Sequence, residues 1–396
     1  MRSLSRRHRL WLSAAAAAIV VLVAAAVVGL SWHHSSTALV PQHRDWPEDV
    51  TVELVAPDHV VLSRSEDTLR PGVYGLVWQA GSAVIGAVTR TDPETVTRRL
   101  RAVRGYLAPG MEVAIDPEVH VGDPRQSLGL GFSEVSVPGE LGRMPGWLIP
   151  GSGDTWAIVV HGINGNPRAG LRVAPTLHRA GLPTMLITYR GDLGAPASPD
   201  GLHHMGLTEW RDLAAAARFA LSRGARRLVL VGYSMGGSLI AQFMQRSPLA
   251  ARVSGLVLDA PALDWQEILA FNATEMGLPG IAAKPVEWAI GARIEADWDS
   301  LDALRHPDSL QLPILLFHGT EDTVVPISIS EELATELPRQ VTFHAVPQAG
   351  HTEAWNVDPG LYGRRLAAFL SRIAAASGQR PAPPRRTESP EGAPGR

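Results

Sequence analysis

Hydrophobic and polar positions follow three different patterns along this chain. From Trp11 to Trp32 the residues are uncharged and almost all apolar. Residues 50–90 form short alternating runs that Pro, Gly and Asp interrupt, and this pattern predicts short β-strands. From about residue 130 onward, near-continuous apolar runs alternate with Ala- and Leu-rich segments. Such runs are typical of parallel strands that helices cover on both faces, so the C-terminal part of the chain predicts an α/β domain.

The apolar runs of the C-terminal part locate its expected strands and helices. Strands are predicted at 155–162, 182–191, 226–234, 253–261, 312–319 and 341–347. Helices are predicted at 208–222 and 236–247, with a last one near 358–376. We therefore expect the α/β domain to occupy residues 128–376. Residues 377–396 hold five prolines and predict a disordered tail.

A smaller unit is expected before this domain. Residues 33–49 are polar and contain proline, which predicts a linker. Residues 50–127 predict a small β-rich module with a strand at 111–115. A short helix is predicted at 93–103, because Asp92-Pro93-Glu94 is typical of a helix start.

The apolar run 11–32 predicts a membrane-spanning helix. Its 22 residues would extend roughly 33 Å as a helix, and a hydrocarbon core is about 30 Å thick. Residues 1–10 carry four arginines and no acid, so the positive-inside rule makes this segment cytoplasmic and places residues 33–396 outside. We therefore expect a single-pass anchor in the cell membrane. The alternative is a signal peptide, whose cleavage would release a secreted protein.

Composition narrows the function classes. The chain has no cysteine, which excludes disulfides, thiol nucleophiles and thiolate metal sites. The formal charge of the whole chain is −3, and removing the four arginines of residues 1–10 leaves −7 for residues 33–396. Nucleic-acid binding requires a basic surface, so this acidic body excludes nucleic acid as a partner.

The hexapeptide GYSMGG, which contains Ser234, is the first candidate for chemistry. It follows a predicted strand and opens a predicted helix. In that setting G-x-S-x-G is a turn that projects the serine hydroxyl at the carboxyl edge of a sheet. The alternative is an ordinary glycine-rich turn with a capping serine. A serine nucleophile needs a base, and the base needs an orienting acid.

Two later segments supply the base and the acid. Asp322 and His351 each follow the carboxyl end of a predicted strand, and open α/β sheets gather their sites at these ends. The order Ser234, Asp322, His351 is the nucleophile, acid and histidine order of one particular fold. Asp259 and Asp264 remain alternatives for the acid, and Glu321 is expected to point away.

A tetrahedral oxyanion needs two fixed donors, and the loss of one typically raises the barrier by about 2.7–4 kcal/mol. The backbone N–H of Met235, directly after the serine, is one expected donor. The N–H of Ile163 is the second, because the segment HGING ends the strand at 155–162. Gly162 would let the chain approach the reacting group closely.

The motifs VVHGING, LITYRGDLGAPASPDG, GYSMGG, HGTEDTVVP and AGH occur in this order between residues 130 and 376. This segment resembles the α/β-hydrolase superfamily, nearest its serine aminopeptidase and prolyl-oligopeptidase-like branch. The resemblance implies an α/β-hydrolase fold with a small lid at about 262–311, and no cofactor or metal. It implies these site residues: Ser234 as nucleophile, Asp322 as acid, His351 as general base, and the Ile163 and Met235 amides as oxyanion hole.

Three other polar features have structural explanations. His161 is expected to hold the oxyanion loop rather than to catalyse. His203-His204 is expected to be a solvated loop pair rather than a metal site, because no third ligand accompanies it. Arg190 is expected to tie down its loop by an ion pair.

The leading interpretation is a membrane-anchored, extracytoplasmic serine hydrolase that cleaves small or lipid-like carboxylic esters. Apolar residues in the lid would favour acyl chains, and they would equally serve to pack the lid onto the domain. An aminopeptidase-like amidase, with Glu353 or Asp192 binding a substrate amine, is one alternative, and a thioesterase is another. A non-enzymatic alternative is an envelope scaffold with a vestigial hydrolase domain, in which residues 50–127 recruit a protein partner.

Overall fold

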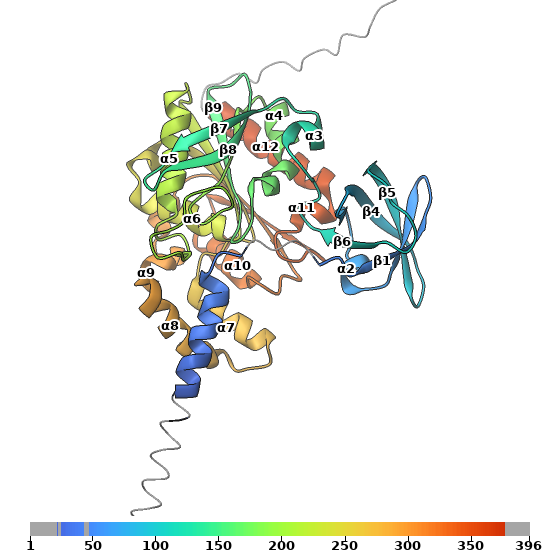
Figure 1. Ribbon diagram of the computed structural model, residues 1–396. Helices are drawn as coiled ribbons and strands as arrows, with labels where there is room; N and C mark the ends of the chain where they lie inside the picture. The colour runs from blue at the N-terminus through green and yellow to red at the C-terminus, as the bar shows by residue number, and fades with distance from the viewer. Residues whose placement is uncertain (1–21, 23–24, 43–46, 377–396) are drawn as a thin grey trace, which may run out of the picture.

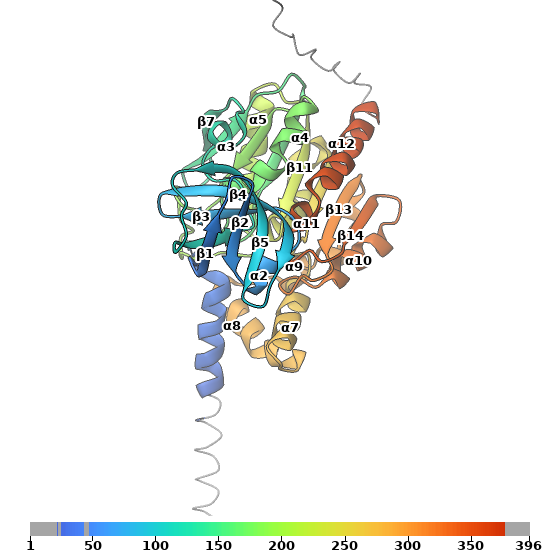
Figure 2. The same ribbon diagram turned by 90° about the vertical axis from the view of Figure 1, so that its right-hand side faces the viewer.

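The computed structural model describes residues 22, 25–42 and 47–376. Figures 1 and 2 show three parts, which are a helix at the N-terminal end, a small barrel of strands β1 to β6, and a larger α/β domain. The barrel packs against one side of the α/β domain (Figure 1). The N-terminal helix lies beside helices α7 (Trp265–Glu275) and α8 (Lys284–Ile294) in both views.

The N-terminal helix continues into the stretch expected to be a linker. Residues 25–39 are helical, so the boundary predicted after residue 32 is wrong for 33–39. The Ser35 and Ser36 hydroxyls donate to the Trp32 carbonyl at 2.8 and 3.1 Å. Ser35 and Leu39 are fully buried. This polar run is helical because its hydroxyls bond the helix backbone and its inner face packs on the larger domain.

The predicted membrane span, 11–32, lies largely outside the described residues, as do the basic segment 1–10 and the tail 377–396. Among the residues that the structure does describe, no helix has the length and apolar character needed to cross a membrane.

The six strands of the β-rich module close into an antiparallel barrel in the order β1-β2-β5-β4-β3-β6. Its interior is apolar, with Val52, Leu62 and Ile85 fully buried. The strands are β1 (Val50–Val55), β2 (His59–Ser63), β3 (Tyr74–Trp78), β4 (Gly81–Thr91), β5 (Thr95–Arg104) and β6 (Glu112–Asp116), with a short helix α2 (Glu66–Leu69) after β2.

The helix predicted at 93–103 is wrong, because this segment is strand β5. Val96, Arg98 and Leu100 face the interior of the barrel. The buried Arg98 guanidinium donates to four carbonyl oxygens at 2.8–3.1 Å, those of Gly86, Thr68, Arg70 and Gly72. An arginine at an inward position interrupts the alternation of apolar and polar residues that identifies a strand in a sequence. The segment is a strand because it pairs with its neighbours in the closed barrel.

The α/β domain contains an eight-stranded sheet in the order β14-β13-β12-β11-β9-β10-β8-β7. β8 and β7 form an antiparallel edge, and the other six strands are parallel. The strands are β7 (Ser133–Pro138), β8 (Arg143–Ile149), β9 (Thr155–Val160), β10 (Thr184–Ile187), β11 (Arg227–Tyr233), β12 (Val253–Asp259), β13 (Ile314–Gly319) and β14 (Val341–Val346). This is the arrangement expected of an α/β-hydrolase fold.

Helices cover both faces of this sheet. One face packs against α4 (Ala174–Arg179) and α12 (Pro359–Ala376), and the other against α5 (Trp210–Ser222), α6 (Met235–Arg246) and α10 (Ile327–Glu336). The segment after β12 forms a lid of α7, α8 and the short helix α9 (Trp298–Leu301). Because the six parallel strands run in one direction, the loops at their carboxyl ends meet at one edge.

Candidate active site

Ser234 occupies a strained turn between β11 and α6. Its backbone has φ 51° and ψ −121°, and a positive φ is unusual for a residue with a side chain. Its N–H donates to the Asp259 carbonyl at 3.1 Å. A Cβ atom at Gly236 would collide with the Val160 carbonyl oxygen, so only glycine allows α6 to approach β9 this closely. The close packing and the backbone bond together hold the turn.

His351 joins Ser234 to Asp322. The Ser234 hydroxyl lies 2.9 Å from His351 Nε2, and His351 Nδ1 lies 2.8 Å from Asp322 Oδ2. A carboxylate only accepts, so Nδ1 carries the proton and Nε2 accepts from the serine. The structure therefore brings the three predicted residues together in a hydrogen-bonded line, and the imidazole has the tautomer that a general base requires.

The Asp322 carboxylate is held by donors on both oxygens. Oδ1 accepts from the N–H groups of Val324 and Val325 at 2.8 and 2.9 Å. Burial raises the pKa of a carboxyl, but the bonds from His318, His351 and Val325 hold the pKa of Asp322 well below its usual value. The acid of the line is consequently ionised at any pH at which the protein would work.

His318 is a residue that the sequence analysis missed. It is fully buried at the end of β13, and its Nε2 donates to the Val325 carbonyl at 2.9 Å and lies 3.2 Å from Asp322 Oδ2. Its Nδ1 accepts from the Ser330 hydroxyl at 2.7 Å. The sequence did offer a reason to consider this residue, because His318 stands at the end of a predicted strand and four residues before Asp322.

The alternative acids lie elsewhere. The Asp259 side chain is buried and forms no hydrogen bond with His351, and burial raises its pKa to about 6. Asp264 caps α7 by accepting from the Gln266 and Glu267 N–H groups. Glu321 is exposed. Among these carboxylates and Asp322, only Asp322 contacts His351.

The two expected oxyanion donors flank the serine. Met235 begins α6, so its N–H has no partner within the helix. The Gly162 carbonyl accepts from Tyr189 Oη at 2.6 Å and His161 Nδ1 at 2.8 Å. A trans peptide directs its C=O and N–H oppositely, so these bonds turn the Ile163 N–H the other way. A Cβ atom added at Gly162 would lie only 3.0 Å from Ser234 Cβ, so this peptide lies beside Ser234.

His161 holds the oxyanion loop as expected. It is buried, stacks on Tyr189 at 4.5 Å between ring centroids, and lies with Nε2 2.9 Å from Asp192 Oδ2. Burial would lower its pKa, but the Asp192 carboxylate and the Gly162 carbonyl raise the pKa of His161 above its ordinary value. Its two ring nitrogens lie near the Gly162 carbonyl and the Asp192 carboxylate, so the ring ties the loop to Asp192.

The other polar residues have separate partners. His203 is buried, so the expectation of a solvated pair is wrong for this residue. Its Nε2 lies 3.2 Å from Asn164 Oδ1, whereas His204 Nε2 lies 2.9 Å from Asp200 Oδ2. No group of three or more His, Asp or Glu side chains suited to a metal ion occurs in the described ranges. Arg190 forms the expected ion pair, with its Nε 2.8 Å from the buried Asp212 carboxylate.

The two carboxylates that the aminopeptidase alternative assigns to a substrate amine already accept hydrogen bonds from this chain. Asp192 binds His161 and accepts from the Tyr189 N–H at 2.7 Å. Glu353 accepts from Arg70 Nη1 at 2.8 Å and from Tyr74 Oη at 3.0 Å. Neither side chain is free to bind an ammonium group.

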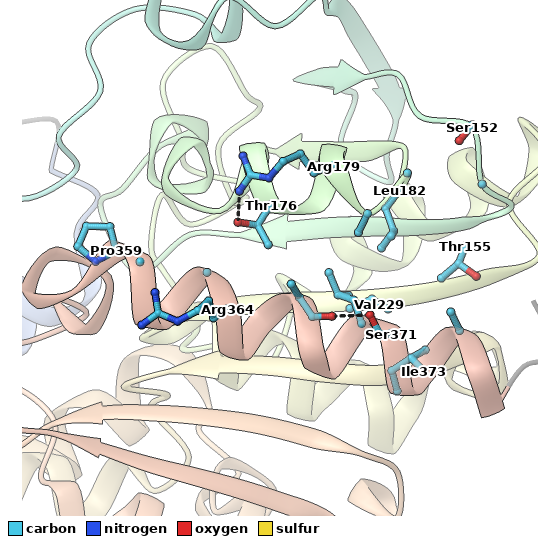
Figure 3. A pocket seen from close by; sticks show the side chains of 18 residues that line it. Ser152, Thr155, Thr176, Arg179, Leu182, Val229, Pro359, Arg364, Ser371 and Ile373 are labelled. Atoms are coloured by element: carbon cyan, nitrogen blue, oxygen red, sulfur yellow. Dashed lines mark hydrogen bonds between the residues drawn. The ribbon is translucent and has the colours of Figure 1, made fainter. Parts of the chain in front are cut away.

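A groove of about 690 Å³ lies between α4 and α12 (Figure 3). Arg179 from α4 and Arg364 from α12 line it, together with Thr155 at the start of β9. Ser234 follows the end of β11, which runs parallel to β9. The groove therefore lies at the amino ends of the parallel strands and Ser234 at their carboxyl ends, so the groove is separate from the candidate active site.

The lid has an exposed apolar tip. In the segment between α7 and α8, Leu278 is 49% exposed, and Ile281 in the short helix η3 (Gly280–Ala283) is 70% exposed. Met276 and Trp288 are also exposed. No charged residue occurs from 276 to 283.

The N-terminal segment contacts both the lid and the oxyanion loop. Arg293 of α8 donates to the Ser35 and Ser36 hydroxyls at 2.8 Å each, and its guanidinium lies 5.1 Å from the Trp32 ring centroid. The Gln42 N–H donates to Asn164 Oδ1 at 2.8 Å. Asn164 directly follows Ile163, so this segment reaches the catalytic edge of the sheet.

Comparison with known families gives two matches. The prolyl oligopeptidase family matches residues 175–376, which are 202 of the 396 residues. A domain of unknown function (DUF8805) matches residues 51–116, the barrel.

Two uncharacterized bacterial proteins each match more than half of this chain. An uncharacterized protein of Mycobacterium tuberculosis is 25% identical over 239 residues, which are 59% of this chain and 76% of that protein. The uncharacterized protein YfhR of Salmonella typhimurium is 27% identical over 255 residues, with 59% and 79% covered.

Two solved structures are similar at lower identity. A Pyrococcus furiosus esterase has a TM-score of 0.53 at 20% identity, covering 64% of this chain and 95% of the esterase. A Mycobacterium tuberculosis puromycin-hydrolyzing peptidase has a TM-score of 0.51 at 18% identity, covering 84% of this chain and 54% of the peptidase. These likenesses confirm the predicted α/β-hydrolase fold.

Proposed function

Because the chain belongs to the prolyl oligopeptidase family of serine hydrolases, we propose that it cleaves carboxylic esters through an acyl-enzyme on Ser234. The observation that carries this proposal is the line of contacts from Ser234 through His351 to Asp322, at 2.9 and 2.8 Å. The intact line also argues against a vestigial hydrolase domain with a purely scaffolding role.

The proposed reaction follows from the geometry. His351 Nε2 takes the hydroxyl proton as Ser234 Oγ attacks the substrate carbonyl, and Asp322 stabilises the imidazolium that forms. The Ile163 and Met235 amides bind the developing oxyanion. The protonated His351 then gives its proton to the leaving alcohol. Water, deprotonated in turn by His351, releases the acid and restores the serine.

Two observations favour an ester over a substrate with a free amine. The Asp192 and Glu353 carboxylates already accept hydrogen bonds at distances of at most 3.0 Å. Either carboxylate would have to break these bonds to bind an ammonium group. The exposed apolar residues of the lid, such as Leu278 and Ile281, suit an acyl chain better than a charged amine.

We further propose that the chain is anchored in the cell membrane with its catalytic body outside. The uncharged run 11–32 and the arginines before it support this placement. The lid supports it as well, because its apolar tip lies at the same end of the molecule as the N-terminal helix (Figures 1 and 2).

The first test is covalent labelling of the full chain in detergent with a fluorophosphonate, followed by intact mass measurement. We expect one adduct on the wild type and none on Ser234→Ala. A folded wild-type chain that gains no mass would contradict the proposed nucleophile.

Substrate class is tested on the same preparation. Rates are compared for acyl esters of increasing length, matched thioesters and aminoacyl arylamides. We expect ester turnover to exceed arylamide turnover, and the reverse order would instead support a peptidase.

Orientation is tested by adding protease to intact spheroplasts. The catalytic body is expected to be digested, and its full protection would contradict an extracytoplasmic location.

A further inference from the structure

The barrel grips the segment that carries His351. Glu353, two residues after the histidine, is buried, and each of its carboxylate oxygens accepts from a barrel side chain. Arg70 Nη1 lies 2.8 Å from Oε1, and Tyr74 Oη lies 3.0 Å from Oε2. The position of this catalytic loop is therefore set partly by residues about 280 positions away in the sequence.

Asn356 joins this loop to the barrel a second time. Its side chain is fully buried, and Nδ2 donates to the Val73 carbonyl at 2.8 Å and to the Pro117 carbonyl at 2.9 Å. Its own carbonyl accepts from the Val73 N–H at 2.9 Å. A Cβ atom at Gly72 would collide with that same carbonyl, so barrel and loop are in backbone contact.

The third partner is the short helix η1 (Pro167–Arg172), which follows the oxyanion loop. Arg172 Nη1 donates to the Thr352 carbonyl at 2.8 Å and to Asn356 Oδ1 at 3.0 Å. At the other end of η1, Arg168 forms an ion pair with Asp116, the last residue of β6. The contacts therefore close a ring that runs from the barrel to the His351 loop, to the oxyanion segment and back to the barrel.

The His351 loop needs such support because its backbone is strained. Gln348 and Thr352 have φ values of 62° and 56°, which lie in the left-handed region. Residues with side chains remain in this region only where the surrounding contacts hold them. The carbonyl of Thr352 is the group that Arg172 binds.

We propose that the barrel, whose family has no assigned function, is a working part of the active site that positions His351 relative to Ser234. Glu353 and Asn356 are positioning residues, because they act through the loop and do not touch the reacting atoms. The inference rests on the catalytic roles proposed above for Ser234 and His351. Small displacements of a catalytic group are costly, since about 1 Å can reduce a rate about 100-fold.

The test removes the barrel's hold on Glu353 in the full chain. Arg70→Ala combined with Tyr74→Phe is expected to lower kcat for a short soluble ester by about 10- to 100-fold, with KM changed less than about twofold. The rate of fluorophosphonate labelling at Ser234 should fall in parallel, because labelling reports the serine and its base without substrate binding. Arg99→Ala is the matched control, since Arg99 lies on the solvent side of the same barrel.

A rescue separates positioning from general stability. The double variant leaves a buried carboxylate without its donors, and an unpaired buried charge is unfavourable. Glu353→Gln in that background is therefore expected to recover at least about threefold in kcat, while Glu353→Gln alone lowers it. Thermal unfolding is measured for each variant to show that the fraction folded is unchanged.

Each outcome decides the matter. Normal kcat and labelling in a folded Arg70→Ala/Tyr74→Phe variant overturn the positioning role alone. If the double variant does not fold, Arg70→Ala by itself is used, because the Arg70 side chain is 42% exposed, and an unchanged kcat there overturns the proposal equally. A wild type that fails to label at Ser234 overturns the proposed function and the positioning role together.

Discussion

The Asp322 carboxylate receives two backbone N–H groups and faces two imidazoles, those of His351 and His318. This environment keeps the acid ionised, because its pKa is held well below the usual range. It also fixes the direction in which Oδ2 presents itself to His351. In the proposed mechanism, Asp322 therefore orients His351 without exchanging a proton.

Asp322→Asn should preserve the shape of the site and reverse the proton preference of His351. Loss of the correct tautomer typically lowers kcat about 10⁴-fold. Ester hydrolysis by the purified full chain measures this loss. Asp259→Asn is the control, since Asp259 does not contact His351, and a comparable loss in that variant would reassign the acid.

The buried pair of His161 and Asp192 predicts a pH dependence of stability. Burial alone would depress the pKa of His161, but Asp192 and the Gly162 carbonyl raise it above the unfolded value. Such a group contributes its full stability below the unfolded-state pKa of about 6.5, and the contribution is lost as pH rises through the folded-state pKa. The free energy of unfolding should therefore fall as the pH rises above about 6.5.

Urea unfolding at several pH values measures this dependence. The decline should be steeper in the wild type than in His161→Gln, which cannot titrate at this position. Equal slopes in the two proteins would show that His161 does not gain a proton on folding.

Elements differed in how far the sequence could predict them. Five of the six parallel strands were found because they are buried along most of their length and read as continuous apolar runs, whereas β14 is only partly buried. The strands β7 and β8 were missed, because they form a half-exposed antiparallel edge without such a run. β5 was misassigned because its inward positions include Arg98.

The candidate site was predictable where chemistry follows local structure. Ser234, Asp322 and His351 each stand just after a strand's carboxyl end, so the topology brings them to one edge. The ion pair between Arg70 and Glu353 could not be predicted from a local sequence pattern, because the two residues are 283 positions apart and belong to different units. Only the packed structure reveals that contact.

Strand β5 offers a test of how the barrel is held together. Arg98→Ala would leave the carbonyl groups of Gly86, Thr68, Arg70 and Gly72 buried without their donor. Each unpaired group costs about 1–3 kcal/mol, so we expect the free energy of unfolding to fall by at least about 3 kcal/mol.

Urea unfolding of the full chain measures this loss. Arg99→Ala, the next residue on the same strand but facing solvent, should change stability by less than about 0.5 kcal/mol. Similar losses in both variants would mean that the carbonyl contacts of Arg98 contribute little.

At the scale of the whole chain, the N-terminal helix and the lid tip form one apolar end (Figures 1 and 2). If residues 11–32 cross the bilayer as proposed, the tip at 276–283 should reach the lipid interface. The tip carries no charge, and Trp288 close by is a residue type favoured at that depth.

Because the natural chain has no cysteine, a fluorescent label can be placed at one engineered site. We expect a label on Leu278→Cys, in full chain reconstituted into phosphatidylcholine vesicles, to shift to shorter wavelength and to be quenched by lipid-borne nitroxides. The control is Tyr106→Cys on the barrel, which is 78% exposed and should behave as in water. Identical spectra at the two sites, in protein that sediments with the vesicles, would exclude contact of the tip with lipid.

The contacts of residues 32–42 have a mechanical consequence. One short stretch of chain binds α8 through Arg293 and the residue beside an oxyanion donor through Gln42 and Asn164. The stretch therefore connects the lid mechanically to the loop that carries Ile163. A tilt of the N-terminal helix would therefore displace both α8 and the loop beside Ser234. Force applied at the N-terminus would reach the proposed active site as well as the lid.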